Sequence, residues 1–347
     1  REQLHEQLIR ELARGFGYLQ SLVTGFLDLL GPKKLVDFLH VNTKPMPLTI
    51  RTNQLKTSAE SLRRTLELRG VKFDLNISNE FPRESGLLTT TKKPPIPLGA
   101  SPEYLCGHYM LQGAASVLPA LALQPKPGDI VLDLCAAPGG KATQLASLMK
   151  DTGTLIVNDA SVRRIPALTC NIHRLGLTNC IVTSFDGTKN LQYPSQHHHH
   201  HPHHRMVFDK VLLDAPCSGT GILSRDVSAR SKRTPHDIQR SSQVQKELIV
   251  AAVDALRPGG SYIIKMVYST CSITVKENEE VIEALLSKRD VKVVISISSF
   301  PFGSRGVKRC GSSSRRFSAC MAHARRLYPH EHGTDGFFIA KLRKISN

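Results

Sequence analysis

The stretch Asp129 to Lys141, D-I-V-L-D-L-C-A-A-P-G-G-K, limits the possible folds more than any other part of the sequence. A short apolar run ends in an acid, a glycine pair follows, and helix-forming residues continue to Met149, which predicts a strand, a tight loop and a helix. Because Gly139 and Gly140 have no Cβ, backbone N–H groups in this loop can approach a ligand closely. The next apolar run ends at Asp159, twenty residues after Gly139, which is the spacing at which a dinucleotide-type fold places a carboxylate on a ribose. A plain α/β turn with a buried acid is the alternative interpretation.

The rest of the chain after residue 129 continues the alternation of strands and helices. We predict strands at 154–158, 180–185, 208–214, 262–268, 291–297 and 336–342, and helices at 163–175, 237–256 and 275–287. Repeated β-α units of this kind predict an α/β fold with a doubly wound, parallel, Rossmann-like sheet, in which an antiparallel strand can occur near the end.

Acidic residues recur where these strands end. Ligands of such a sheet bind beyond the carboxyl ends of its strands, and the acids there are Asp133, Asp159, Asp186 and Asp214. A single acid at a strand end is usually a helix cap, but a series beside a glycine turn favours a nucleoside site, with Asp159 on the ribose and Asp186 on the adenine amino group. The chain has no G-x-x-x-x-G-K-[ST] phosphate loop, which favours a nucleoside without a polyphosphate. S-adenosylmethionine is such a nucleoside, and carboxylates would stabilise its sulfonium charge.

Two cysteines also follow predicted core strands. Cys217 comes after Asp214-Ala215-Pro216, and Cys271 comes after Ser269-Thr270. Since adjacent strands lie about 5 Å apart, both sulfurs can face one pocket. A thiolate that adds to carbon 6 of cytosine makes carbon 5 nucleophilic enough to accept a methyl group, which is covalent catalysis. Asp214 is placed to hydrogen-bond the base, and Lys141 could lower a thiol pKa or contact the base.

The residues before 101 have other patterns. Residues 1–30 show a helical period that Gly31-Pro32 is expected to end, and residues 47–91 read as a small α+β module. The helix of this module carries Arg63, Arg64 and Arg69, which indicates either a solvated face or an RNA contact. We therefore predict a helical segment at 1–40, an α+β RNA-binding module at 41–100 and the main domain at 101–347.

Charge favours nucleic acid as the partner. The formal net charge is +17, and residues 301–347 hold ten Lys and Arg against two acids; a basic surface without a polyanionic partner is the alternative. The eight cysteines form no C-x-x-C pair, so we expect no metal and no disulfide framework. The His-rich stretch 193–205 favours a low-complexity insertion over a metal site. No apolar run has membrane-spanning length, and the start at Arg1 without Met suggests a fragment or a processed piece.

Several motifs together resemble one family. C-A-A-P-G-G-K at 135–141, N-D-A at 158–160, D-A-P-C-S-G-T-G at 214–221 and S-T-C-S-I-T at 269–274 resemble the Sun-type RNA cytosine-5 methyltransferases. G-H-Y-M-L-Q-G-A at 107–114 and D-G-F-F-I-A-K at 335–341 are similar to its nucleolar branch, which methylates large-subunit ribosomal RNA and assists ribosome assembly. The resemblance implies S-adenosylmethionine as cofactor, pre-ribosomal RNA and particles as partners, and the nucleus and nucleolus as location.

The resemblance also implies a role for individual residues. Cys271 would be the nucleophile, and Cys217 would assist release of the methylated product. The cofactor would be held by Cys135, Ala136, Ala137, Pro138, Gly139, Gly140, Lys141, Asp159, Asp186 and Asp214. Asp214 would also contact the target base, and the 47–91 module would bind RNA. Two alternatives stay open: an assembly factor whose catalytic site is incidental, and a methyltransferase for transfer RNA.

Overall fold

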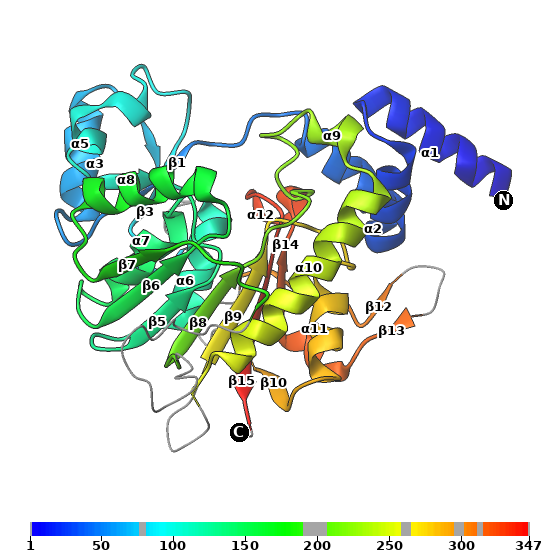
Figure 1. The fold of residues 1–347 in the computed structure, drawn as a ribbon. Coiled ribbons are helices and arrows are strands. Elements are labelled where there is room, and N and C mark those ends of the chain that lie inside the picture. The colour runs from blue at the N-terminus through cyan, green and yellow to red at the C-terminus, as the bar shows by residue number, and fades with distance from the viewer. Residues whose placement is uncertain are drawn as a thin grey trace. The chain divides into compact units, whose positions relative to one another are not determined.

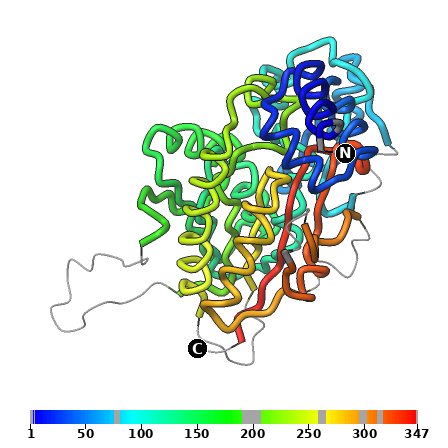
Figure 2. The backbone as a smooth tube through the Cα atoms, turned by 90° about the vertical axis from the view of Figure 1, so that its right-hand side faces the viewer, coloured from blue at the N-terminus to red at the C-terminus, as the bar shows by residue number. Residues whose placement is uncertain are grey.

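The computed structural model describes residues 2–75, 81–189, 207–257, 265–294, 302–310 and 315–345 (Figures 1 and 2). The chain divides into two compact units. The first, here called the loop unit, comprises 47–214, 250–268 and 342–347; the second, the cysteine unit, comprises 1–46, 215–249 and 269–341. The His-rich stretch 193–205, as well as 262–264 and 295–297 of the predicted strands, lies outside the described residues.

The loop unit contains the predicted parallel strands. They are β5 (Ile130–Asp133), β6 (Thr154–Asn158), β7 (Cys180–Thr183), β8 (Lys210–Asp214) and the first residues of β9 (Lys265–Thr270), in the order β9-β8-β5-β6-β7 (Figure 1). β5 is parallel to both β6 and β8, and β6 is parallel to β7. The strand order therefore reverses between β5 and β8, and such a switch point is where open α/β sheets bind ligands. The Rossmann-like fold class is confirmed.

The helices of this unit alternate with its strands along the chain. They include α6 (Leu118–Leu123), α7 (Gly140–Leu148) and α8 (Ile165–Leu175). Pro166 lies in the first turn of α8, where a missing N–H breaks no hydrogen bond, so this proline is compatible with the helix. Val131, Leu132 and Leu212 in the strands are fully buried, as expected for a parallel sheet with both faces covered.

A small antiparallel sheet precedes these strands in the chain. It contains β1 (Thr49–Thr52), β2 (Phe73–Asp74), β3 (Leu87–Thr90) and β4 (Tyr109–Leu111) in the order β2-β3-β1-β4 and carries α3 (Ala59–Leu68). Ile50, Leu62 and Leu66 form part of its core. The Ser58 hydroxyl accepts a hydrogen bond from the Ser61 backbone N–H and so caps α3. The sequence did not predict β4, because Gly107 and His108 before it read as a loop.

The arginines of α3 are engaged in ion pairs. Arg63 contacts Glu60 and Glu67, and Arg64 also contacts Glu60. Arg69, which follows the last residue of α3, pairs with Glu103 at 2.8 Å. The pairs of Arg63 and Arg64 join residues three or four apart on the exposed helix and stabilise it only weakly. These contacts favour the solvated-face interpretation, while RNA binding by this module stays a prediction.

The cysteine unit begins with two helices, α1 (Glu2–Phe16) and α2 (Gln20–Val41), at the blue end of the chain in Figure 2. The predicted end of the first helical stretch at Gly31-Pro32 is confirmed, because Gly31 (φ +73°, ψ 168°) is non-helical and α2 consists of two helical segments that meet there. The stretch is also broken earlier, at Gly17, whose φ is +72°. Pro32 starts the segment after the kink, where no N–H is needed, and Phe38 further along α2 is fully buried and packs edge-on against Phe26.

The remaining elements complete the cysteine unit and its borders. α10 (Pro235–Asp254) starts in this unit, and β14 (Arg325–Leu327) pairs antiparallel with β11 (Ser304–Arg305) and with β15 (Phe337–Lys344). The others are α5 (Pro102–Leu105) in the loop unit, and α9 (Ala229–Lys232), α11 (Glu279–Leu286), α12 (Pro329–His332), β10 (Val291–Val294), β12 (Arg309–Cys310) and β13 (Arg315–Arg316) in the cysteine unit. None of the helices described is both long and apolar enough to cross a membrane.

Candidate active site

The glycine loop joins β5 to α7 as the sequence predicts. Gly139 has a φ of +105° and precedes the first helical residue, Gly140. A Cβ at Gly139 would lie 3.1 Å from the Leu168 side chain, and its positive φ would strain any other residue. The Ala136 backbone N–H donates to the Asn158 carbonyl at 2.7 Å, which ties the loop to the end of β6. The loop is thus held open at the carboxyl edge of the strands.

Asp159 lies beside this loop. Its buried carboxylate accepts hydrogen bonds from the Ala137 N–H at 3.2 Å and the Ser161 N–H at 3.0 Å, and it pairs with Arg164 at 3.0 Å. The structure therefore brings the predicted acid and the predicted loop together. Whether Asp159 also binds a ribose stays a prediction.

Lys141 and Asp214 also meet. The Lys141 Nζ lies 2.7 Å from the Asp214 carboxylate and 2.8 Å from the Ser116 hydroxyl. Lys141 stands in the first turn of α7, and Asp214 ends β8. The pair thus spans the β5–β8 switch point and places one cation and one anion where a ligand of this fold binds.

The pKa of Asp133 is strongly shifted in the folded chain, which the sequence did not indicate. Burial, followed by the nearby Asp214 carboxylate, raises its pKa to about 8, although Lys141 and the Cys135 backbone N–H oppose the rise. Burial also raises the pKa of Cys135, so that thiol stays protonated and is no nucleophile. A carboxyl group with so high a pKa would be stabilised in its charged form by a bound cation.

Asp186 has different surroundings. Its side chain is about half exposed, and it accepts hydrogen bonds from the N–H and the hydroxyl of Thr188 at 3.0 and 2.7 Å. These bonds lower its pKa. The side chain is thus engaged with its own turn, and its contact with an adenine amino group stays a prediction.

The two predicted cysteines lie together in the cysteine unit. Cys217 Sγ and Cys271 Sγ are 3.1 Å apart, and the Ala215 N–H donates to the Ser269 carbonyl at 2.8 Å just before them. The structure thus brings the two sulfurs together, while the pocket that they were predicted to face stays a prediction. The hydrogen bond with Cys271, together with burial, raises the pKa of Cys217 well above that of a free thiol. The surroundings of Cys217 therefore favour its neutral thiol.

Two glycines make the Cys271 loop possible. The Gly221 N–H donates to the Cys271 carbonyl, and the Gly336 N–H donates to the Gly221 carbonyl, both at 2.8 Å. A Cβ on Gly221 would lie 2.1 Å from the Gly336 oxygen and 2.7 Å from the Cys271 oxygen. The second half of the D-A-P-C-S-G-T-G motif therefore serves close backbone packing.

Glu277 was missed as a site residue, because the sequence placed it in a helix start. α11 begins at Glu279, and Glu277 precedes it, fully buried. Its carboxylate accepts hydrogen bonds from the Ser218 N–H at 2.7 Å, the Ser272 hydroxyl at 2.5 Å and the Thr274 hydroxyl at 2.9 Å. The hydroxyl-rich run S-T-C-S-I-T just before an acid was the available signal.

Arg51 of β1 was also missed. Its buried guanidinium donates to Gln112 at 2.7 Å, to the Gly140 carbonyl at 2.5 Å and to Thr143 at 2.8 Å. Burial lowers its pKa to about 9. The small antiparallel sheet is therefore connected to the start of α7 within the loop unit.

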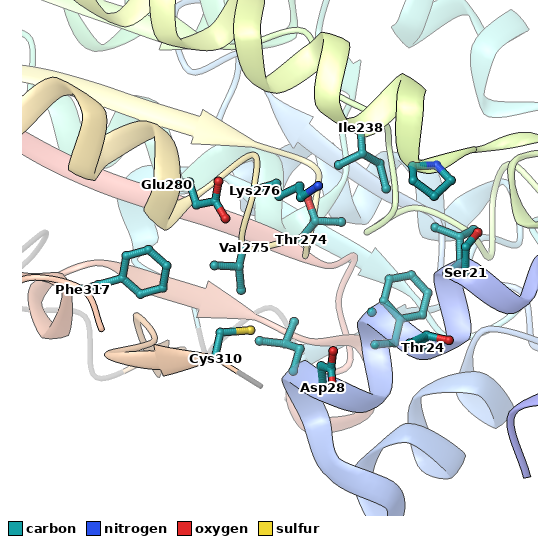
Figure 3. Close-up of a pocket in the computed structure, with 15 residues that line it drawn as sticks. Ser21, Thr24, Asp28, Ile238, Thr274, Val275, Lys276, Glu280, Cys310 and Phe317 are labelled. Carbon is teal, nitrogen blue, oxygen red and sulfur yellow. The ribbon is translucent and has the colours of Figure 1, made fainter. Parts of the chain in front are cut away.

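A separate cavity of about 470 Å³ lies within the cysteine unit (Figure 3). Asp28 of α2, Thr274, Glu280 and Phe317 are among the residues that line it, and neither Cys217 nor Cys271 does. Thr274 belongs both to this wall and to the Glu277 hydrogen bonds. Among the residues that the structure describes, no group of three or more His, Cys, Asp or Glu could hold a metal ion.

Comparisons with known proteins agree with this geometry. Residues 120–343 match the family described as 16S rRNA methyltransferase RsmB/F. The chain is 42% identical to a mouse 28S rRNA (cytosine-C(5))-methyltransferase, with 98% of this chain and 40% of that protein aligned. It is 34% identical to a Pyrococcus abyssi tRNA (cytosine(49)-C(5))-methyltransferase, with 87% of this chain and 89% of that protein aligned.

Solved structures with the same fold are also known. A methyltransferase homolog from Pyrococcus horikoshii matches with a TM-score of 0.80 and 32% identity over 97% of this chain and 99% of that one. NSun6 from the same organism, solved with SFG, matches with a TM-score of 0.74 and 25% identity over 94% and 98%. The chain spans only part of the length of these eukaryotic relatives: 40% of the mouse protein and 54% of the Schizosaccharomyces pombe 25S rRNA (cytosine-C(5))-methyltransferase nop2.

Proposed function

This chain belongs to the RsmB/F family of rRNA methyltransferases, and on that premise we propose that it methylates carbon 5 of a cytosine in RNA with S-adenosylmethionine as cofactor. The observation that carries the proposal is the 3.1 Å contact between Cys217 and Cys271. Methyl transfer to oxygen or to an exocyclic nitrogen requires no thiol nucleophile, whereas carbon 5 of cytosine does.

The loop unit fits the cofactor. The positive φ of Gly139 opens a loop whose backbone a ligand can approach, and Asp133 with its raised pKa would be stabilised by a sulfonium charge. We assign cofactor binding to residues 135–141 with Asp159, Asp186 and Asp214. When bound, S-adenosylmethionine supplies an electrophilic methyl group.

The two thiols have different roles in the reaction. Cys271 as thiolate adds to carbon 6 of the base, and the electron pair of the carbon 5–carbon 6 bond makes carbon 5 the nucleophile. After methylation, a water molecule accepts the carbon 5 proton, the electron pair of that C–H bond re-forms the carbon 5–carbon 6 double bond, and the Cys271 sulfur leaves carbon 6 as a thiolate. Cys217, whose raised pKa keeps it protonated, donates a hydrogen bond to the departing sulfur. Asp214, held by Lys141, hydrogen-bonds the base.

We further infer that the substrate is large-subunit ribosomal RNA in pre-ribosomal particles, in the nucleolus. Relatives named as 28S and 25S rRNA methyltransferases are 40–42% identical to this chain. The +17 charge suits a polyanionic substrate. Transfer RNA is a second candidate, because the archaeal relative that this chain covers almost completely carries that activity in its name. An assembly role with incidental catalysis is the alternative from another class, and the paired thiols favour the enzyme.

Labelled methyl incorporation tests the function. The protein is incubated with S-adenosylmethionine carrying a labelled methyl group and with unmodified large-subunit rRNA or transfer RNA transcripts, and the RNA is hydrolysed to nucleosides. We expect label in 5-methylcytidine, more from rRNA than from transfer RNA, and none with Cys271→Ala. Label in another nucleoside, or retention of 5-methylcytidine in Cys271→Ala, would refute the proposal.

A further inference from the structure

The residues that follow the two reactive cysteines are joined by one carboxylate. Ser218 comes directly after Cys217, and Ser272 comes directly after Cys271. Glu277 Oε1 accepts the Ser218 backbone N–H at 2.7 Å, and Oε2 accepts the hydroxyls of Ser218 and Ser272, both at 2.5 Å. A single side chain therefore bridges two loops that are 54 residues apart in sequence.

Further hydrogen bonds extend this bridge to the residue before Cys217. Gln245 Nε2 donates to Glu277 Oε1 at 3.2 Å and to the Pro216 carbonyl at 2.8 Å. The Thr220 hydroxyl lies 2.9 Å from that of Ser272. The Cys217 loop is thus held on both sides of its thiol, and the hydroxyl donors of both loops meet at one oxygen.

Burial makes this arrangement informative. Glu277 is fully buried, and a carboxylate removed from water costs several kcal/mol unless its oxygens are well hydrogen-bonded. A neutral side chain of similar shape could fill the same volume without that cost, but it could not accept hydrogen bonds on both of its terminal atoms. The carboxylate is needed because donors from two loops converge on both of its oxygens.

We propose that Glu277 is a positioning residue that fixes the separation of the Cys217 and Cys271 thiols. This inference rests on the proposed function for its kinetic consequence, but its geometric part does not. At 3.1 Å the two sulfurs are in contact, and a shift of about 1 Å in either loop removes a hydrogen bond of this kind. In this scheme Glu277 positions the two thiols through Ser218 and Ser272, and its charge also raises the pKa of Cys217.

The geometric part is tested with phenylarsine oxide, a probe that binds tightly only when two thiols lie close enough to share its arsenic. Capture is measured by intact mass after competition with excess glutathione, without RNA or cofactor. Cys271→Ser gives the background from other cysteines. We expect Glu277→Gln to weaken capture about tenfold, equivalent to about 1.4 kcal/mol. Glu280→Gln is the matched control, because it removes the same charge three residues later from a side chain that faces the cavity in Figure 3, and it should capture as the native chain does.

The kinetic part is tested in single-turnover reactions on RNA, by following formation and decay of the denaturation-resistant adduct. If Glu277 positions the release thiol, Glu277→Gln slows decay at least fivefold more than formation, and Ser272→Ala does the same to a smaller extent. A merely structural role would scale both rates with the folded fraction, which circular dichroism measures.

The two arms separate failure of the inference from failure of the function. Native capture by Glu277→Gln would overturn the inference, whatever the activity. If Glu277→Gln loses capture and the native chain methylates no RNA, the positioning role is supported and the proposed function is refuted. If Glu277→Gln does not fold, Ser272→Ala decides the question, and unchanged capture and an unchanged ratio of the two rates in that variant would overturn the inference.

Discussion

Gly221→Ala should disrupt the backbone around Cys271 directly. The new Cβ would lie 2.1 Å from the Gly336 oxygen, 2.6 Å from the Gly336 carbonyl carbon and 2.7 Å from the Cys271 oxygen. All three are backbone atoms, so no flexible side chain can move aside. The Gly221 and Gly336 segments must separate, and the two 2.8 Å hydrogen bonds that join them and the Cys271 loop are lost or stretched.

The expected cost follows from those contacts. Forced overpacking costs about 1–3 kcal/mol, and each hydrogen bond contributes about 1 kcal/mol. We therefore expect the free energy of unfolding to fall by about 3–5 kcal/mol, measured by urea titration with intrinsic fluorescence and circular dichroism. Methylation should fall in the fraction that stays folded as well, because the Cys271 carbonyl is displaced.

Gly15→Ala is the matched control for this substitution. Gly15 lies in α1, and a Cβ there meets nothing within 4 Å. Because alanine is the better helix former, this variant should gain up to about 1 kcal/mol. Equal urea midpoints for Gly221→Ala and the native chain, with unchanged activity, would refute the close packing described for the Cys271 loop.

Two further predictions concern the loop unit. Asp133 has a pKa of about 8 in the folded chain. Between about pH 4 and 8 the folded state therefore keeps this proton, whereas the unfolded state has already lost it, so the free energy of unfolding should fall as pH rises through this range. Urea unfolding as a function of pH should show this fall, Asp133→Asn should reduce it, and an identical pH profile in the variant would contradict the assignment. Arg51→Lys keeps the positive charge but cannot supply the guanidinium fork that bonds Gln112, the Gly140 carbonyl and Thr143. We expect the free energy of unfolding in urea to fall by about 2–3 kcal/mol and S-adenosylmethionine to bind more weakly in calorimetry. Native values for both would exclude a role for Arg51 in holding the loop.

The sequence predicted those parts of the fold whose signals are local. Strand β5, the glycine loop and α7 follow from an apolar run, two glycines and helix formers within twenty residues. Pro166 was correctly accepted inside a helical stretch because the apolar period continued past it. Gly31-Pro32 was read by the same kind of rule and does interrupt the helix, but the break at Gly17 was missed, because Phe16 and Leu19 continue the apolar period across it.

The candidate site was predictable where a residue's position at a strand end sufficed. That rule placed Cys217 beside Cys271 and Asp159 beside the glycine loop. It could not find Glu277 or Arg51, because both act through tertiary contacts with residues far away in sequence. Nor could it show that Asp133 is the carboxyl group with the raised pKa, since burial and the neighbouring Asp214 produce that effect only in the folded chain.

The most direct measurement uses RNA with 5-fluorocytosine at the target position, because the fluorine prevents loss of the group at carbon 5 after methylation. We expect a protein–RNA adduct that resists denaturation, requires S-adenosylmethionine, disappears in Cys271→Ala and persists in Cys217→Ala. An adduct that persists in Cys271→Ala and vanishes in Cys217→Ala would reverse the two roles. An adduct that depends on neither cysteine would refute covalent catalysis by this pair of thiols.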